Sequence, residues 1–442
     1  MGTSILAALL VSLISAQPAS DHTDSAQSSP RYWRGNLHTH TFWSDGDDFP
    51  EMVVDWYAKH EYNFLAISDH NTMQHDVVFK KLADLDKRSR GKAFQKYLDR
   101  FGSNWVETRG SREAGTLEVR LKPFHEYRSL FDNAGRFIMI PAEEITAEAA
   151  NKRAIHINAT NLIDLIKPQQ GATVAEVIAR TTTIAKEQAQ RTGREILVHV
   201  NHPNYKWGVT AEDLAAIIND RFFEVWNGVD NDNDPGNDVY PSTDQIWDIA
   251  NTLRIAAFRA EPLLGLATDD SHDYHQDTIR AMPGRGWVMV RASHLTPESL
   301  IRAMRRGDFY ASSGVELESV TFDAQTRQLS LKIKPCKDEK FVTRFVGTRK
   351  GANMVGTPRR ASDGSIVETT LDYTVPGKPV IGETLATVDG QAPSYTLKGD
   401  ELYVRAIVTS SGIPDFPTKE SQLKKAWTQP VGWESRMAPA SK

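Results

Sequence analysis

Cysteine is almost absent from this chain, since Cys336 is the only one among 442 residues. A single thiol excludes an internal disulfide framework and argues against a zinc site built on cysteine. Any metal ion would therefore be bound by histidine and carboxylate side chains. The sequence also lacks a Gly-x-Ser-x-Gly elbow and a glycine-rich phosphate loop, which excludes the usual signatures of serine hydrolases and nucleotide-binding proteins.

An excess of positive charge is missing too. The formal net charge of -5 argues against binding to a nucleic-acid polymer, which depends on neutralising phosphates.

The apolar run from Ile5 to Ile14 is too short to span a bilayer, but it fits the core of a signal peptide. We expect a signal peptide over residues 1–20, a flexible leader over 21–31, and a periplasmic or secreted protein with no membrane span. The alternative is a disordered or lightly anchored N-terminus.

Residues 32–313 alternate short apolar runs with amphipathic stretches, which is typical of buried parallel strands in βα units. The apolar runs cover residues 63–68, 137–141, 154–158, 195–200, 221–226 and 263–267, and helices are expected over 50–60, 173–190 and 296–306. The charged stretch at about 74–136 predicts a helical insertion over the barrel mouth, which acts either as a lid or as a packed surface elaboration. Residues 314–442 alternate polar and apolar positions between turns, which predicts an antiparallel β domain, most simply a sandwich.

The candidate ligands follow the ends of the expected strands, where βα barrels build their active sites. His38 and His40 are two residues apart, so a strand would point both imidazoles to one side with Cα atoms about 6.5 to 7 Å apart. Both rings can then reach one ion at about 2.0 to 2.1 Å.

Asp45 follows His40 by five residues and is either a ligand or simply a turn residue. The later strands and their ends supply the remaining candidates, which are His70, Glu143, Glu144, His156, His199, His202, Glu224, Asn227, Asp270 and His272. One carboxylate of the Glu143–Glu144 pair can bridge two metals. In isolation His156 is more often a core histidine than a ligand. His199 and His202 offer two imidazoles, and we favour His202 because it lies beyond the strand end. Glu224 and Asn227 are expected to position water, substrate or a metal-bound histidine.

Taken in order, these motifs resemble the PHP (polymerase and histidinol phosphatase) superfamily over residues 32–313. The matching segments are His38-Thr-His40 with Ser-Asp45-Gly, Ser-Asp-His70, Glu144-Ile-Thr, His202-Pro and Asp270-x-His272. The C-terminal β domain is similar to that of the CehA/McbA-like metallohydrolases within this superfamily. The resemblance implies a distorted seven-stranded (β/α) barrel of the TIM type.

The resemblance also implies three metal positions. The first would be held by His38, His40, Glu144 and Asp270, the second by Glu144, His156 and His202, and the third by Asp45, His70 and His272. Asp45 stands where family members often have histidine, which predicts a third site that is either weaker or empty. Imidazole and carboxylate ligands suit two or three ions of Zn, Mn or Fe(II).

A metal-dependent hydrolase follows, and we expect a phosphoesterase that uses metal-activated water on a small-molecule phosphate ester. Asp45, His70, Glu144 and His272 are the expected catalytic residues, and Arg153, Asn227 and Arg285 the expected substrate-binding residues. Tryptophans near the mouth keep a second hypothesis open, a carboxylic ester, amide or carbamate hydrolase of the CehA/McbA type. A non-catalytic binding or scaffold protein is the third.

Overall fold

The computed structural model describes residues 29–229, 234–275 and 280–437. The expected signal peptide and most of the expected leader, residues 1–28, lie outside these ranges. Within the described residues, no helix combines the length and the apolar character that a membrane crossing requires.

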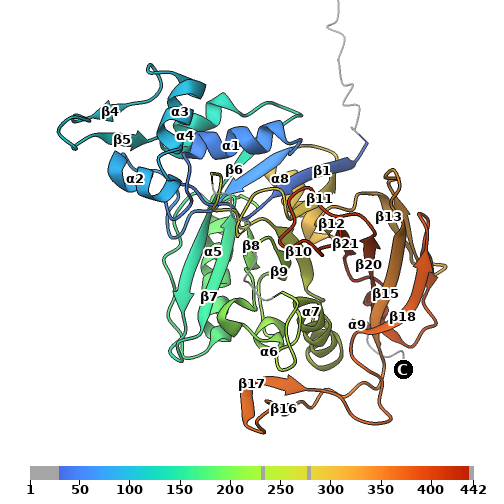
Figure 1. Cartoon of the computed structure of the whole chain (residues 1–442). Coiled ribbons are helices and arrows are strands. Elements are labelled where there is room, and N and C mark those ends of the chain that lie inside the picture. The colour runs from blue at the N-terminus through green and yellow to red at the C-terminus, as the bar shows by residue number, and fades with distance from the viewer. Residues whose placement is uncertain (1–28, 230–233, 276–279, 438–442) are drawn as a thin grey trace, which may run out of the picture.

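A large mixed sheet organises the molecule (Figure 1), and its strands run in the order β10-β9-β8-β7-β6-β2-β1-β11-β12-β21-β20-β15-β18. The strands of the first part are β1 (Arg31–Asn36), β2 (Phe64–Ile67), β6 (Ile138–Glu148), β7 (Ala154–Thr160), β8 (Leu197–Val200), β9 (Phe222–Asn227), β10 (Leu264–Thr268), β11 (Trp287–Ala292) and β12 (Phe309–Ser312). Parallel pairs join β1 to β2, β2 to β6, β8 to β9 and β9 to β10. The carboxyl ends of these strands therefore meet at one edge of the sheet.

The expectation of parallel pairing fails at β7, which is antiparallel to both β6 and β8. Five residues, 149–153, connect β6 to β7, whereas a parallel connection needs a crossover of a dozen or more. The ladder pairs Glu144 with Asn158 and Thr146 with His156. Because β7 runs backwards, its N-terminal half lies beside the carboxyl ends of the parallel strands.

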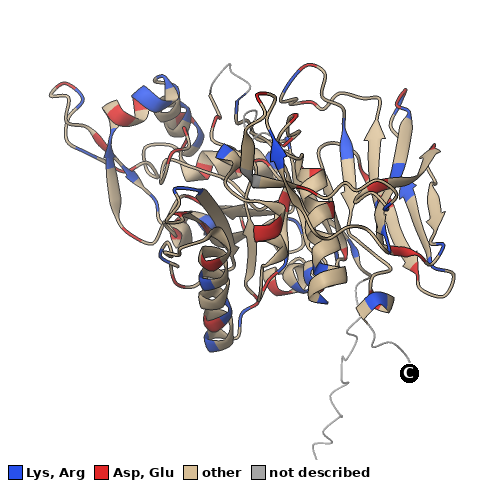
Figure 2. Ribbon diagram, turned by 90° about the horizontal axis from the view of Figure 1, so that it is seen from below, with Lys and Arg blue, Asp and Glu red and all other residues tan. Residues whose placement is uncertain are grey.

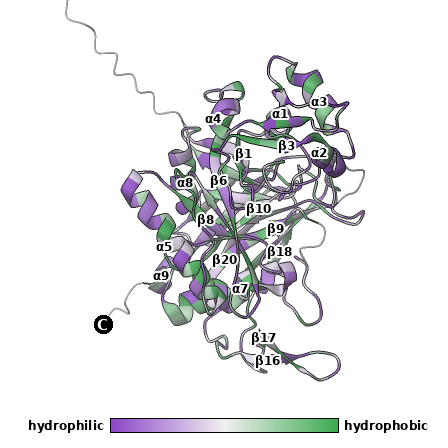
Figure 3. Cartoon of the chain, turned by 90° about the vertical axis from the view of Figure 1, so that its left-hand side faces the viewer, coloured by the Kyte–Doolittle hydropathy of each residue, from purple (hydrophilic) through white to green (hydrophobic). Residues whose placement is uncertain are grey.

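Helices pack against this sheet, three of them over the expected ranges 50–60, 173–190 and 296–306 and the others at places where none was predicted. They are α1 (Pro50–Lys59), α5 (Val174–Thr192), α6 (Ala211–Ala215), α7 (Thr243–Thr252), the π-helical turn η3 (Leu253–Phe258) and α8 (Pro297–Arg305). Side-chain oxygens of Thr173 and Thr296 cap α5 and α8 by accepting backbone N–H groups, and prolines open α1 and α8. Figure 3 shows hydrophobic and hydrophilic residues alternating along helices such as α5, as amphipathic helices on a core require.

The insertion, which we define as residues 74–136, mixes strands with helices instead of being purely helical. It contains β3 (Val78–Lys81), α2 (Leu82–Ser89), α3 (Ala93–Phe101), β4 (Thr108–Arg109), β5 (Glu118–Leu121), α4 (Phe124–Tyr127) and the 3₁₀ turn η1 (Arg128–Leu130). A separate sheet orders its strands β3-β5-β4. The segment carries many charged residues (Figure 2), and its short strands bury few side chains. The alternation of polar and apolar residues that predicts a strand is therefore weak in this part of the sequence.

The C-terminal strands are antiparallel, as expected; most of them form two layers, and one pair forms a separate two-stranded sheet. They are β13 (Leu317–Asp323), β14 (Gln328–Ile333), β15 (Phe341–Arg349), β16 (Thr357–Arg360), β17 (Ile366–Asp372), β18 (Glu383–Asp389), β19 (Ser394–Thr396), β20 (Glu401–Ser410) and β21 (Lys425–Thr428), followed by α9 (Glu434–Met437). Residues Leu329, Phe345 and Tyr395 belong to the core between the sheet β13-β14-β19 and the main sheet. Because β21 pairs with β12, the main sheet is continuous across residue 313.

Candidate metal centre

Most of the candidate ligands gather at the edge where the parallel strands end. His38 and His40 follow β1, His70 follows β2, and Asp270 follows β10. The segments after β1 and β10 are joined, because His40 N donates to Ser271 O (3.0 Å) and Asp270 N donates to His38 O (3.1 Å). Residues more than 200 positions apart in the sequence are thus fixed side by side.

The first cluster consists of His38, His40, Glu144 and Asp270, all buried. His38 Nε2 lies 3.2 Å from Glu144 Oε2 and 3.1 Å from Asp270 Oδ1. The corresponding distances from His40 Nε2 are 3.1 and 3.0 Å. Four ligands placed tetrahedrally at about 2.1 Å from one ion would be about 3.4 Å apart, so these separations fit a shared ion.

Buried polar atoms without hydrogen-bond partners also indicate a shared ion in the first cluster. Among the described residues, His40 Nε2, Glu144 Oε2 and Asp270 Oδ1 have no hydrogen-bond partner of acceptable geometry. Buried polar atoms are nearly always satisfied, and here acceptor atoms converge from three sides. A cation at their centre would satisfy all of them.

Charge inside the cluster strongly perturbs its acids and bases. Burial lowers the pKa of His40, but the carboxylates of Asp270 and Glu144 outweigh it and raise that pKa to about 10. Burial raises the pKa of Glu144, yet the surrounding histidines hold it well below its usual value. Carboxylates that draw protons onto imidazoles in this way would equally attract a cation.

The second cluster is built around the other oxygen of Glu144. Its Oε1 lies 3.0 Å from His156 Nδ1 and 3.5 Å from His202 Nε2, and the His156 and His202 ring centroids are 4.9 Å apart. Asn201 Nδ2 donates to the same oxygen (2.9 Å), which fixes the carboxylate. Glu144 therefore faces the first cluster with one oxygen and the second with the other.

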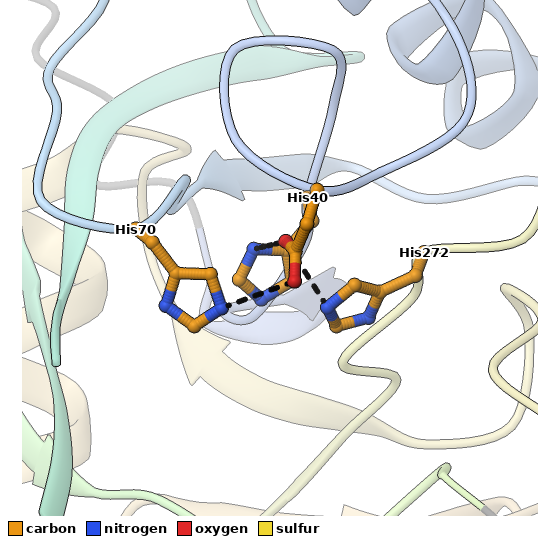
Figure 4. Close-up of side chains that lie close together, drawn as sticks. His40, His70 and His272 are labelled. Carbon is orange, nitrogen blue, oxygen red and sulfur yellow. Dashed lines mark ion pairs between the residues drawn. The ribbon is translucent and has the colours of Figure 1, made fainter. Parts of the chain in front are cut away.

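The third cluster surrounds Asp45, and Figure 4 shows the rings of His40, His70 and His272 pointing toward one another there. Asp45 Oδ1 lies 3.4 Å from His272 Nε2 and Asp45 Oδ2 lies 3.5 Å from His70 Nε2, while His40 Nδ1 is 3.6 Å from Oδ1. The Asp45 side chain is 53% exposed, so this cluster forms the open side of the centre.

Behind the first cluster, Glu224 contacts both of the alternative histidine positions. Its Oε1 is 2.8 Å from His38 Nδ1 and 3.4 Å from His199 Nε2, and its Oε2 accepts from the His202 backbone N (2.8 Å). His199 thus faces Glu224, while His202 Nε2 faces Glu144 and, at 3.9 Å, Asp270. Asn227 Nδ2 donates to Glu224 (2.9 Å) and to Asp270 (3.2 Å).

The two arginines expected to bind substrate have other partners. Arg285 is fully buried, and its guanidinium donates to the backbone carbonyls of Gly228, Arg280, Phe416 and Pro417. It ties chain segments together, and a phosphate would have to displace these bonds. Arg153 Nη2 forms an ion pair with Asp213 at 2.6 Å.

Sequence reasoning left the role of Asp69 open and gave none to Asp269, although each directly precedes a ligand segment. Asp69 accepts from Thr41 N (2.8 Å) and Ser44 N (3.0 Å). Asp269 accepts from Gly284 N, Arg285 N, Gly286 N and the Tyr57 hydroxyl. The only signal in the sequence is their place in Ser-Asp-His and Asp-Asp-Ser-His, which does not say which loops they hold.

Comparison with known proteins gives a distant likeness. No protein-family model and no curated protein matches the chain. Among solved structures it is similar to a "two-domain protein containing predicted PHP-like metal-dependent phosphoesterase" from Bacteroides vulgatus, with 14% identity, a TM-score of 0.38, and coverage of 90% of this chain and 95% of that one. It is also similar to a protein from Bifidobacterium adolescentis that is named provisionally as a metal-dependent phosphoesterase, with 13% identity, a TM-score of 0.30, and coverage of 58% and 92%. Because identity and structural overlap are both this low, the assignment of function rests on the geometry of the buried centre.

Proposed function

We propose that this protein is a metal-dependent hydrolase, and that phosphate esters are its substrates. The observation that carries the proposal is the position of Glu144, whose two carboxylate oxygens face two different groups of imidazoles. A bridging carboxylate of this kind serves ions a few ångströms apart, and paired ions suit hydrolysis of phosphate esters.

The histidine and aspartate or glutamate side chains of the three clusters are ligands that suit such ions. At His272 the position of a ring proton can also be derived from its hydrogen bond. His272 Nδ1 lies 2.7 Å from the carbonyl oxygen of Asp270. Since a carbonyl can only accept, Nδ1 carries a proton, which leaves Nε2, on the Asp45 side, as the nitrogen that would bind an ion. We assign His38, His40, Glu144 and Asp270 to one ion, Glu144, His156 and His202 to a second, and Asp45, His70 and His272 to a third. Divalent cations bound there would polarise the ester and activate a water molecule.

The chain itself contributes orientation and access. Thr146 Oγ1 is 2.5 Å from His70 Nδ1 and directs Nε2 of that ring toward Asp45. Asp45, His70 and His272 border the exposed side, so an ester would approach from there with its leaving group toward solvent. Arg153, near the start of β7, pairs with Asp213 through Nη2, and its Nε has no hydrogen-bond partner among the described residues, so a phosphate oxygen could bind there while the ion pair stays in place.

A carboxylic ester, amide or carbamate substrate is the second candidate. Its support is an aromatic side chain beside the second cluster, Tyr205, whose ring centroid is 5.2 Å from that of His202 and 5.5 Å from that of His156. Closure of the main sheet into a seven-stranded barrel, the CehA/McbA relationship and export through residues 1–20 are further proposals. A mass measurement on the mature chain tests the last.

Metal analysis joined to a substrate panel tests the function. We expect protein purified without chelator to contain two or three equivalents of Zn, Mn or Fe, and to hydrolyse p-nitrophenyl phosphate or bis-p-nitrophenyl phosphate faster than p-nitrophenyl acetate. Faster hydrolysis of the acetate would favour the second candidate. Failure to bind any of these metals would contradict both.

A further inference from the structure

A tight backbone turn carries Asp45, and we call residues 41–48 the Asp45 loop. Thr41 O accepts from Ser44 N (3.1 Å) and from Gly46 N (3.0 Å), and Phe42 N donates to Asp48 O (2.8 Å). Only glycine fits at position 46, because an added Cβ would lie 2.6 Å from Thr41 N.

The Asp45 carboxylate depends on this backbone for its position. The side chain is 53% exposed, and apart from the three histidines it accepts a hydrogen bond from Ser44 Oγ at 3.3 Å. A half-exposed aspartate has few packing contacts to hold it. Its place opposite His70 and His272 therefore follows from the path of residues 44–46.

Cations from the insertion hold this path from outside. Arg88 Nη1, on α2, donates to Ser44 O (2.6 Å) and to Gly46 O (3.0 Å), the carbonyls on either side of Asp45. Lys80 Nζ, on β3, donates to Phe42 O. Both cationic side chains thus donate hydrogen bonds to backbone carbonyls of the Asp45 loop.

Apolar packing joins the same two parts of the chain. Phe42 and Phe49 are fully buried in a cluster with Leu82 and Leu85 of α2, and the Phe49 ring stacks on Tyr97 of α3 with centroids 4.1 Å apart. The insertion is thus fixed to the loop by a core of its own. A lid that opens and closes would have to break this packing, whereas a support would not.

We infer that the insertion is a clamp on the Asp45 loop, and that Arg88 is a positioning residue that sets the affinity of the third metal position. This inference rests on the proposed function. Asp69 still holds Thr41 and Ser44 from the other side, so loss of both Arg88 hydrogen bonds leaves the start of the loop in place. It frees the carbonyls that flank Asp45, and the carboxylate then faces His70 and His272 in a less fixed position. Residues that orient metal ligands typically contribute 10- to 100-fold to metal affinity.

Titration of the metal-free protein with Mn²⁺, followed by calorimetry and by metal analysis after gel filtration, tests this inference. In Arg88→Ala we expect the weakest class of Mn²⁺ sites to lose about 10- to 100-fold in affinity, with the tighter sites unchanged. Arg88→Lys keeps the charge and should recover part of the affinity. Asp45→Ala should show the same loss, and Arg88→Ala should add little to it, since both act on one site.

Arg100→Ala is the matched control. Arg100 also lies in the insertion and also makes a tie to the rest of the chain, but its partner is Asp55 on α1 (2.8 Å) rather than the Asp45 loop. It should bind Mn²⁺ as the wild type does. The clamp would be overturned if Arg88→Ala bound Mn²⁺ with the affinity of the wild type, or if Arg100→Ala lost as much affinity as Arg88→Ala. Neither result would contradict the proposed metal centre. A wild type that binds no metal would overturn the proposed function and the clamp with it.

Discussion

His38 and Glu224 form a fully buried pair in which His38 Nδ1 lies 2.8 Å from Glu224 Oε1. Because a carboxylate accepts, this contact places the proton on Nδ1 and turns Nε2 toward Glu144 and Asp270. The same carboxylate accepts from the backbone of His202. One side chain therefore orients ligands assigned to two different ions.

Replacement of Glu224 tests this orientation. We expect Glu224→Gln to fold but to bind metal about 10- to 100-fold more weakly, because an amide in its place can donate as well as accept and no longer fixes the His38 proton. Proton–nitrogen NMR of labelled histidines in the Zn²⁺-bound protein should show a changed His38 Nδ1–H signal, because a neutral amide oxygen accepts this hydrogen bond more weakly than a carboxylate does. An unchanged His38 signal would contradict the assignment even if activity fell.

Removal of ligands from the first cluster should abolish turnover. His40→Ala and Asp270→Ala each delete one of four converging donors, and we expect more than about a 100-fold loss of kcat/KM, since changes outside the ligand shell alone cost 10- to 100-fold. His294→Ala is the control, because His294 is exposed and hydrogen-bonds to Ser293. Full activity in either ligand variant would leave the first cluster without a catalytic role.

Metal removal should lower stability. An ion that binds only the folded chain stabilises it by about 2.7 kcal/mol at a free concentration 100 times Kd. Thermal unfolding should therefore shift to lower temperature when chelator replaces Mn²⁺ or Zn²⁺. The shift should shrink in His40→Ala, and a shift of the same size in both proteins would place the stabilising ion elsewhere.

Glu51 predicts a pH dependence that is independent of the metal centre. Burial raises the pKa of Glu51 to about 7, despite hydrogen bonds from the Tyr97 hydroxyl (2.5 Å) and Trp105 Nε1 (2.9 Å). The folded state thus favours the protonated acid, so this group's contribution to stability is complete below about pH 4.5 and is lost as the pH rises through about 7. The loss is on the order of 3 kcal/mol.

Urea unfolding of chelator-treated protein at pH 5 and pH 8 measures this contribution. Glu51→Gln cannot ionise, so the difference in unfolding free energy between the two pH values should be smaller than in the wild type. Glu187→Gln, at an exposed position of α5, should behave as the wild type. An identical pH dependence in Glu51→Gln would show that Glu51 is not protonated in the folded chain.

The sequence was sufficient to predict which residues meet, because ligands that follow the ends of neighbouring parallel strands must share an edge. It placed His38, His40, His70 and Asp270 on that principle. It failed for the direction of β7, since pairing depends on a five-residue connection that periodicity does not reveal. It did not reveal the four distant carbonyls to which Arg285 donates, because an arginine with such partners has the same local sequence as one that faces a ligand.

The β6–β7 hairpin also determines where the chain can tolerate changes in length. Opposite residues of an antiparallel ladder point to the same side, so Glu144, Asn158 and His156 are presented together. An extra residue inserted within either strand would invert part of this set and turn Glu144 or His156 away from the centre. The same insertion within the connection 149–153 would leave the pairing of β6 with β7 unchanged. The connection can therefore vary in length, whereas neither strand can gain or lose a residue without turning ligands away from the centre.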